Sequence, residues 1–409
     1  MDTIQVIFFL ISGFLVSRLI IKVKLPQRIV FFFIGEKHLS LSRILLYLLA
    51  LSAFLSLFIP NAITVLTLLP ILELLRQSFD PADPTHKNVP TLLALSAIYG
   101  ANIGGMGSLT GTPANGILVS YAELNRVPGS EMLTFAAWLV WGIPLVICFV
   151  AVAWLALAGV FRTWRFAARP IRLPFDAGQT HHPLQKTGFI ITLIFFLSSL
   201  LFSALLMQYP AHGRGILIAT GAFTALFSLF LFFFPLAGWE NTGKRPLLTL
   251  KDCYSDLPAR GFVFVGVAVA LAGILYLLKL HLYFAELAQK ILPGELSVFA
   301  IYLVIALITS FATEILSNTA VQLSFFIVAL PLAKTLGFSA LQGLIIITLS
   351  CTCAFMSPIA TGVNGLAFGG VKGVSLSRML AAGFVMNIAG ALLISYWALF
   401  VIGRVLGIR

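Results

Sequence analysis

Hydroxyl and amide side chains recur at the same spacing in two apolar parts of the chain. Ser56 stands five residues before Asn61, and Thr313 stands five residues before Asn318. In each set a phenylalanine lies two residues before the hydroxyl residue. Neutral oxygens of this kind, together with backbone carbonyls at helix ends, suit a small hard cation such as Na⁺.

A second polar pattern follows each of these sets. It lies in two uncharged stretches, 88–122 and 335–371, whose middles contain glycine or proline. The recurring residues are Gly111, Thr112 and Asn115 in the first stretch and Ala360, Thr361 and Asn364 in the second. Both stretches exceed the ~20 residues that one membrane span needs, so each is predicted to be one spanning helix broken inside the membrane.

Short apolar arms precede each predicted broken helix. They are residues 44–59 and 62–72 in the first case and 296–313 and 319–333 in the second. Arms of this length reach only about 16–27 Å as helices. We therefore expect re-entrant hairpins at 41–76 and 295–334, with the polar sets at their tips.

The composition requires a membrane setting for these elements. Of the 409 residues, 60% are hydrophobic and 10% are charged, whereas soluble domains carry about 25% charged residues. This excludes a soluble enzyme, a disordered scaffold and a nucleic-acid binder, despite the net charge of +12. The fold class expected is an all-α polytopic membrane protein in a lipid bilayer, and no cofactor is implied.

The order of elements repeats along the chain. Residues 1–161 form a first repeat that ends in a span at 132–161, and residues 162–260 hold basic connectors and two linker spans. Residues 261–409 form a second repeat with spans at 261–278 and 379–403. Because an odd number of crossings separates the two starting points, the repeats are predicted to be inverted, as in many secondary transporters.

Charge predicts the orientation in the membrane. Five connectors hold 19 of the 26 Lys and Arg residues, namely 18–43, 76–87, 161–187, 240–260 and 372–378. Basic loops face the cytoplasm, so both termini are expected outside, in a plasma membrane of the bacterial inner-membrane type. Neither the tips nor the breaks contain Lys or Arg. A bound anion would therefore be held by amides, hydroxyls and helix N-termini.

These motifs resemble those of the divalent anion:sodium symporters, which carry dicarboxylates, citrate or sulfate. Ser317-Asn318-Thr319-Ala320 matches the Ser-Asn-Thr motif of that family, and 104–116 is similar to its first break. The first tip reads Pro60-Asn61-Ala62-Ile63-Thr64, which departs from the motif. Gly362-Val363 stands where the family has a Pro-Pro pair. The family usually has further N-terminal helices, which this chain is expected to lack.

The resemblance implies sodium-coupled symport of a small anion by an elevator mechanism, in a homodimer, with sodium as the only metal. One sodium site would use Ser56, Asn61 and the Gly111 carbonyl. Its mirror would use Thr313, Asn318 and the Ala360 carbonyl. The substrate, a di- or tricarboxylate or a sulfate-like oxyanion, would contact Asn61, Thr64, Thr112, Ser317, Asn318, Thr319 and Thr361.

Other functions are also compatible with the sequence. Glu314 is an intramembrane carboxylate and therefore a candidate proton site, which would favour a proton-coupled antiporter or an oxyanion efflux permease. A structural carboxylate at a helix end or in a pair is an equally supported interpretation of Glu314. Pro60 and Ala62 would also fit a subunit or receptor that no longer transports. A membrane-embedded enzyme is disfavoured because the spans contain no nucleophile paired with a base and no cluster of metal ligands.

Overall fold

The computed structural model describes residues 3–34, 40–79, 84–165, 182–236, 245–254 and 296–407, with a few positions between 270 and 286. These residues are almost entirely helical, which confirms the all-α membrane fold class. Five helices in the described segments are long and apolar enough to cross a membrane. They lie at Phe135–Phe161, Gln185–Leu206, Gly213–Phe233, Asn318–Leu336 and Leu376–Val405. The expected span 261–278 falls largely outside the described residues.

The N-terminal part contains the first hairpin and the first broken helix. Its helices are α1 (Thr3–Lys22), α2 (Leu25–Ile34), α3 (Leu41–Ser56), α4 (Asn61–Gln77), η1 (Pro84–Asn88), α5 (Val89–Gly105), α6 (Pro113–Leu124), η2 (Ser130–Met132), α7 (Phe135–Phe161) and η3 (Thr163–Arg165). The stretch 88–122 is thus interrupted between Gly105 and Pro113. Pro113 begins α6, where its missing N–H costs nothing.

The C-terminal part repeats this order. Its helices are α13 (Val298–Ala312), α14 (Asn318–Leu336), α15 (Ala340–Cys351), α16 (Gly362–Gly370), α17 (Leu376–Trp397), the π-helical η6 (Ala398–Ile402) and α18 (Gly403–Val405). The second arm of this hairpin is longer than the expected 319–333. With 19 residues, α14 is long enough to cross a membrane.

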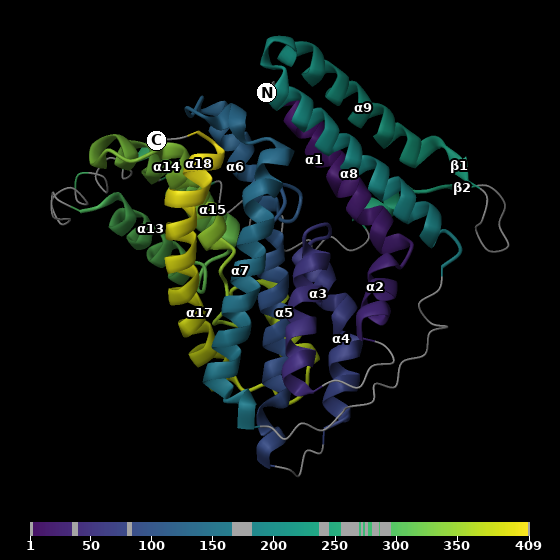
Figure 1. Ribbon diagram of the computed structural model, residues 1–409, viewed down its shortest axis with the longest axis vertical. Helices are drawn as coiled ribbons and strands as arrows, with labels where there is room; N and C mark the ends of the chain where they lie inside the picture. The colour runs from purple at the N-terminus through teal and green to yellow at the C-terminus, as the bar shows by residue number, and fades with distance from the viewer. Residues whose placement is uncertain are drawn as a thin grey trace.

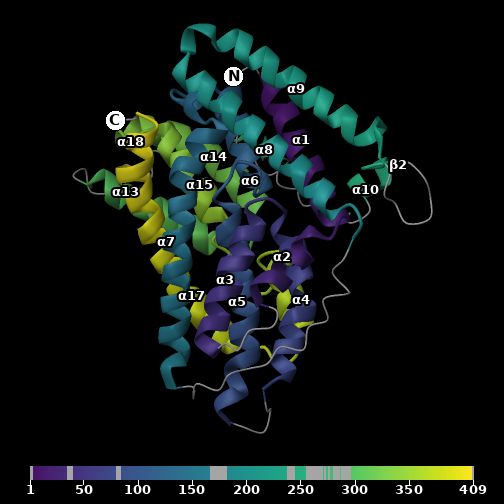
Figure 2. The same ribbon diagram turned by 45° about the vertical axis from the view of Figure 1, so that its right-hand side comes forward.

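A linker region joins the two parts. It contains α8 (Gln185–Gln208), η5 (Pro210–His212), α9 (Gly213–Phe233), the paired strands β1 (Pro235–Leu236) and β2 (Arg245–Pro246), and α10 (Leu250–Tyr254). Helices α1, α8 and α9 pack on one another along one flank of the molecule (Figure 1). The two hairpins lie in different halves of the molecule, with α3 and α4 below α13 and α14 (Figures 1 and 2).

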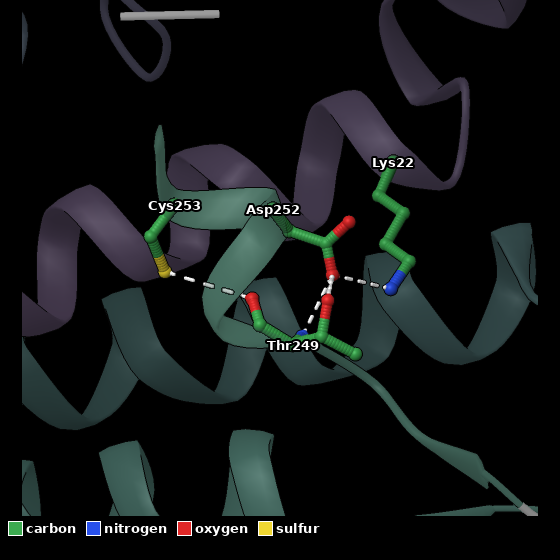
Figure 3. A network of polar contacts seen from close by, with 4 residues as sticks. All are labelled: Lys22, Thr249, Asp252 and Cys253. Atoms are coloured by element: carbon green, nitrogen blue, oxygen red, sulfur yellow. Dashed lines mark hydrogen bonds and ion pairs between the residues drawn. The ribbon is translucent and has the colours of Figure 1, made fainter. Parts of the chain in front are cut away.

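A charged contact ties the linker to the first helix (Figure 3). Asp252 Oδ2 accepts hydrogen bonds from Lys22 Nζ at 2.6 Å, and from the backbone N–H and hydroxyl of Thr249 at 2.7 and 2.8 Å. Burial alone would raise the pKa of the Asp252 carboxyl, but the Lys22 and Thr249 hydrogen bonds outweigh it, so that pKa is lowered. The carboxylate form therefore holds α10 against α1.

Small residues let α3 and α5 approach closely. A Cβ placed on Gly100 would meet the Leu49 carbonyl and Ser52, and one placed on Gly104 would overlap the Ala53 backbone. Ser52 Oγ also donates to the Ala97 carbonyl at 2.7 Å. Glycines four residues apart on one helix face permit such backbone-to-backbone packing. This interface fixes the first hairpin against the first half of the broken helix.

We expect Gly104→Ala to lower the thermal stability of the detergent-solubilised protein. The new methyl group must displace the backbone of α3, at a cost of about 1–3 kcal/mol or more. Gly159→Ala is the matched control, because no atom lies within 4 Å of a Cβ at that position in α7. Equal melting temperatures for the two variants would contradict the close α3–α5 contact.

Candidate functional site

The first hairpin tip lies against the first helix break. Ser56 Oγ donates to Asn61 Oδ1 at 2.6 Å across the turn between α3 and α4. A Cβ placed on Gly105 would lie 2.8 Å from Asn61 Oδ1, and one on Gly111 would lie 3.0 Å from the Ser56 carbonyl oxygen. The tip and both ends of the break therefore meet, and only glycine leaves room for that approach.

Asn115 shapes the first break. Its Nδ2 donates to the carbonyls of Gly105 at 2.9 Å and Ser108 at 2.7 Å. The Gly105 carbonyl is at the end of α5 and the Ser108 carbonyl follows that end, where helix geometry leaves acceptors without intrahelical partners. Ser108 Oγ in turn donates to the Leu57 carbonyl at 2.5 Å. The irregular backbone of the break is thus satisfied by side chains and remains fixed next to the tip.

Asn364 performs the same task in the second break. Its Nδ2 donates to the carbonyls of Ala354 at 2.9 Å and Ser357 at 2.8 Å. All three residues lie 249 positions after their counterparts in the first break. Thr361 caps α16, because its Oγ1 accepts the Asn364 N–H at 3.2 Å. The hydrogen-bond pattern therefore repeats with the sequence motif.

The second tip resembles the first in its hydroxyl–amide pair. Thr313 Oγ1 lies 2.7 Å from Asn318 Oδ1 and 2.9 Å from the Cys351 carbonyl oxygen, at the end of α15. Ser317 caps α14 by accepting the Ala320 N–H at 3.3 Å. This tip thus presents hydroxyl and amide oxygens beside the end of the first half of the second broken helix.

Glu314 joins the second tip to the second break and to α17. Its Oε1 accepts the N–H groups of Phe355 at 2.7 Å and Met356 at 2.9 Å, and the side-chain amide of Asn387 at 2.9 Å. Its Oε2 accepts the Ser357 N–H at 2.8 Å. The carboxylate is only 6% exposed, and every partner recorded for it in the described part of the chain is a donor. Glu314 therefore acts as an acceptor that fixes the backbone after α15.

Two buried amides connect the hairpin of one part to the broken helix of the other. Asn102 of α5 accepts from Asn61 Nδ2 at 3.3 Å and donates to the Ala354 carbonyl at 2.9 Å. Gln322 of α14 donates to the Ala114 carbonyl at 2.7 Å and lies 3.0 Å from Thr348 Oγ1. The two tips and two breaks consequently form one polar region without Lys or Arg. Such oxygens can coordinate a small cation, and the helix N-termini can attract an anion.

Comparison with known protein families decides what kind of protein carries this region. The family described as sodium:sulfate symporter transmembrane region matches residues 3–407. The chain belongs to this symporter family. It is therefore a transporter of the multi-pass membrane type, and the membrane-enzyme alternative is set aside.

Curated relatives of this symporter family align with nearly the whole chain. The sodium-dependent dicarboxylate transporter of Staphylococcus saprophyticus is 26% identical over 419 residues, covering 99% of this chain and 78% of the relative. The transporter of the same name from Staphylococcus aureus is 27% identical over 422 residues, with the same coverage. Both names describe the relatives as sodium-dependent transporters of dicarboxylates.

Most of the expected sodium ligands lie together in two groups. Ser56, Asn61 and Gly111 are brought together, as are Thr313 and Asn318. Ala360 is buried within the second break, where its N–H donates to the Ser357 carbonyl at 3.3 Å. Ion binding at these residues stays a prediction.

The expected substrate contacts also differ in exposure. Thr112, Ser317, Thr319 and Thr361 are half-buried at the tips and breaks. Thr64, by contrast, is fully buried in α4, and its hydroxyl has no hydrogen-bond partner among the described residues. Thr64 could therefore reach a ligand only if the surrounding helices moved. Substrate contact at all of these positions stays a prediction.

Sequence reasoning missed Asn102, Gln322 and Asn387. Each is a buried amide in an apolar helix, and each holds a hairpin or a break in place. Polar residues inside a membrane span are costly, so an isolated amide in an uncharged stretch was the available signal. Their partners could not be identified because they lie up to 252 residues away along the chain.

Proposed function

We propose that this symporter imports a small carboxylate or sulfate-like oxyanion together with Na⁺. The observation that carries the proposal is the pair of matched tips, each with a hydroxyl oxygen within 2.7 Å of an asparagine oxygen beside a helix break. One ion would be bound by Ser56, Asn61 and the Gly111 carbonyl, and the other by Thr313, Asn318 and the Ala360 carbonyl. Paired neutral oxygens favour Na⁺ without a buried counter-charge.

The anion would lie between the two tips. Asn61, Thr64 and Thr112 would face it from the first part, and Ser317, Asn318, Thr319 and Thr361 from the second. Four helices begin at or next to these residues, namely α4, α6, α14 and α16. The dipoles at their N-termini favour negative charge. Because no guanidinium or ammonium group is present in the tips or breaks, bound Na⁺ would provide the positive charge that retains the anion.

Alternating access would proceed by an elevator motion. In this proposal the repeats are inverted, and the hairpins with their broken helices move together past α1, α8 and α9. The cross-links through Asn102 and Gln322, which join the two parts, support such a rigid unit. We further propose a homodimer, with the basic connectors in the cytoplasm and both termini outside.

Uptake into proteoliposomes tests the coupling ion. For a panel of succinate, citrate, sulfate and hexanoate, we expect at least one anion to enter at least about tenfold faster under an inward Na⁺ gradient than under a choline gradient. Liposomes without protein are the control for passive entry. Protein-dependent uptake that is equal in Na⁺ and choline would contradict the proposal.

A further inference from the structure

The two hairpin tips offer an anion different groups. In the second tip, Ser317 and Thr319 flank Asn318 with two hydroxyl groups. In the first tip the flanking residues are Pro60 and Ala62, which have no side-chain donor, and Pro60 also lacks an N–H. The second tip can therefore donate several hydrogen bonds to a carboxylate, whereas the first has lost the equivalent side-chain donors.

A cavity of about 550 Å³ begins at the first tip and break. It is lined by Pro60, Leu109 and Thr112, and by Leu323 of α14. It then follows one face of α6, because the lining residues recur at helical spacing from Pro113 to Leu124. Leu323 lies about one and a half helical turns after Asn318, which brings the second hairpin to the same cavity.

The cavity suits an apolar group and not a second negative charge. None of its lining residues, all of them in the described part of the chain, carries a formal charge. Five lining residues have hydroxyl groups, namely Ser17, Thr110, Thr112, Ser120 and Tyr121, but the lining surface is mainly apolar. The Ser17 hydroxyl is already engaged by the carbonyls of Gly13 at 3.0 Å and Phe58 at 2.7 Å. Because most of the lining surface is hydrocarbon, an ionised carboxylate placed deep in the cavity would exchange its hydration for few hydrogen-bond partners, which is unfavourable.

We propose that the anion carried by this chain is charged at one end only, as in an aliphatic monocarboxylate. Its carboxylate is held by Ser317 and Thr319 at the second tip. Its hydrocarbon end occupies the cavity between Pro60, Leu109 and Leu323. This inference rests on the proposed function and narrows its substrate to a class different from the dicarboxylates named for the relatives.

A matched pair of ligands tests the proposal. Hexanoate and adipate have the same chain length and differ only in that a carboxylate replaces the terminal methyl group. We expect detergent-solubilised protein in NaCl to bind hexanoate at least about 100-fold more tightly than adipate, measured by titration calorimetry. Direct binding avoids passive permeation of the neutral acid through a bilayer. The same titrations in choline chloride measure the sodium dependence.

A matched pair of double variants locates the two ends of the ligand. Pro60→Ser with Ala62→Thr gives the first tip the residue types of the second, and we expect adipate to bind at least about tenfold more tightly to it. Ser317→Ala with Thr319→Ala removes the hydroxyls that hold the shared carboxylate. This variant should weaken both ligands by at least about tenfold. Serine is a favoured N-cap residue, so the first variant is expected to fold.

Each result of the wild-type titrations decides a separate claim. Adipate binding as tightly as hexanoate in NaCl would overturn the one-ended substrate and leave sodium coupling in place. A hexanoate preference that persists unchanged in choline would overturn sodium coupling and leave the substrate class in place. Binding of neither ligand in either salt would overturn both. These outcomes do not depend on the folding of either variant.

Discussion

Asn318→Ala is expected to reduce sodium-driven anion uptake by at least about 100-fold. Asn318 begins α14, and its Oδ1 lies 2.7 Å from Thr313 Oγ1, so one side chain serves the expected ion site and the expected anion site. Removing it deletes an ion ligand and leaves the Thr313 hydroxyl with one partner fewer. Initial rates of uptake into proteoliposomes, measured over a range of Na⁺ concentrations, give the size of the effect.

Two further asparagine variants make the result specific. Asn61→Ala should cause a loss of similar size, because Asn61 occupies the matching position and also contacts Asn102 at 3.3 Å. Asn125→Ala should transport like the wild type, because Asn125 is exposed at the end of α6, and its side-chain amide donates to the Tyr121 carbonyl of the same helix. Wild-type uptake by Asn318→Ala, or an equal loss in Asn125→Ala, would contradict the assignment of the second tip.

Much of the fold was predictable because its signals are local. A proline–asparagine turn at 60–61, glycines before residue 112 and uncharged stretches longer than one span all act within a few residues. Helices α3 and α4 occupy Leu41–Gln77, the segment in which the sequence predicts the first hairpin at 41–76, and its re-entrant character stays a prediction. The five-residue spacing also predicts that Ser56 and Asn61 share the tip, where Ser56 Oγ donates to Asn61 Oδ1 at 2.6 Å.

The contacts between the two parts were not predictable in this way. Asn102 and Ala354 are joined by a hydrogen bond across 252 residues, and Gln322 and Ala114 by one across 208. Periodicity and spacing contain no information about which distant segments meet. The role of Gly104 was also ambiguous, because a glycine in a helix can mark a break or a close packing contact. The structure shows a packing contact with Ala53, one residue before the helix ends.

The interpretation of Glu314 depended on the same missing information. From the sequence, a proton site and a structural carboxylate were equally supported. Its four donors favour the second interpretation, because an ionised carboxylate accepts hydrogen bonds only, whereas a protonated one must also donate. Glu314 therefore accepts hydrogen bonds from backbone groups that the broken helix leaves without partners, as Asn115 and Asn364 donate to backbone carbonyls in the breaks.

Glu314→Leu is expected to lower the free energy of unfolding by at least about 4 kcal/mol. Three backbone N–H groups at residues 355–357 and the Asn387 amide would lose their acceptor inside the protein. Each buried donor without a partner costs about 1–3 kcal/mol. Thermal unfolding in detergent measures this loss, and sodium-driven uptake should disappear with it because the second break is no longer fixed beside Thr313.

Glu314→Gln separates the structural role from proton coupling. Glutamine keeps one acceptor oxygen but places an amide donor against a donor, so we expect a smaller loss of stability than in Glu314→Leu, together with reduced uptake that still depends on Na⁺. If Glu314 carried the coupling proton, the glutamine variant would instead keep wild-type stability and lose only uptake driven by a pH gradient. That pattern would replace sodium coupling by proton coupling, whereas a stability loss in both variants identifies Glu314 as the acceptor that holds the second break.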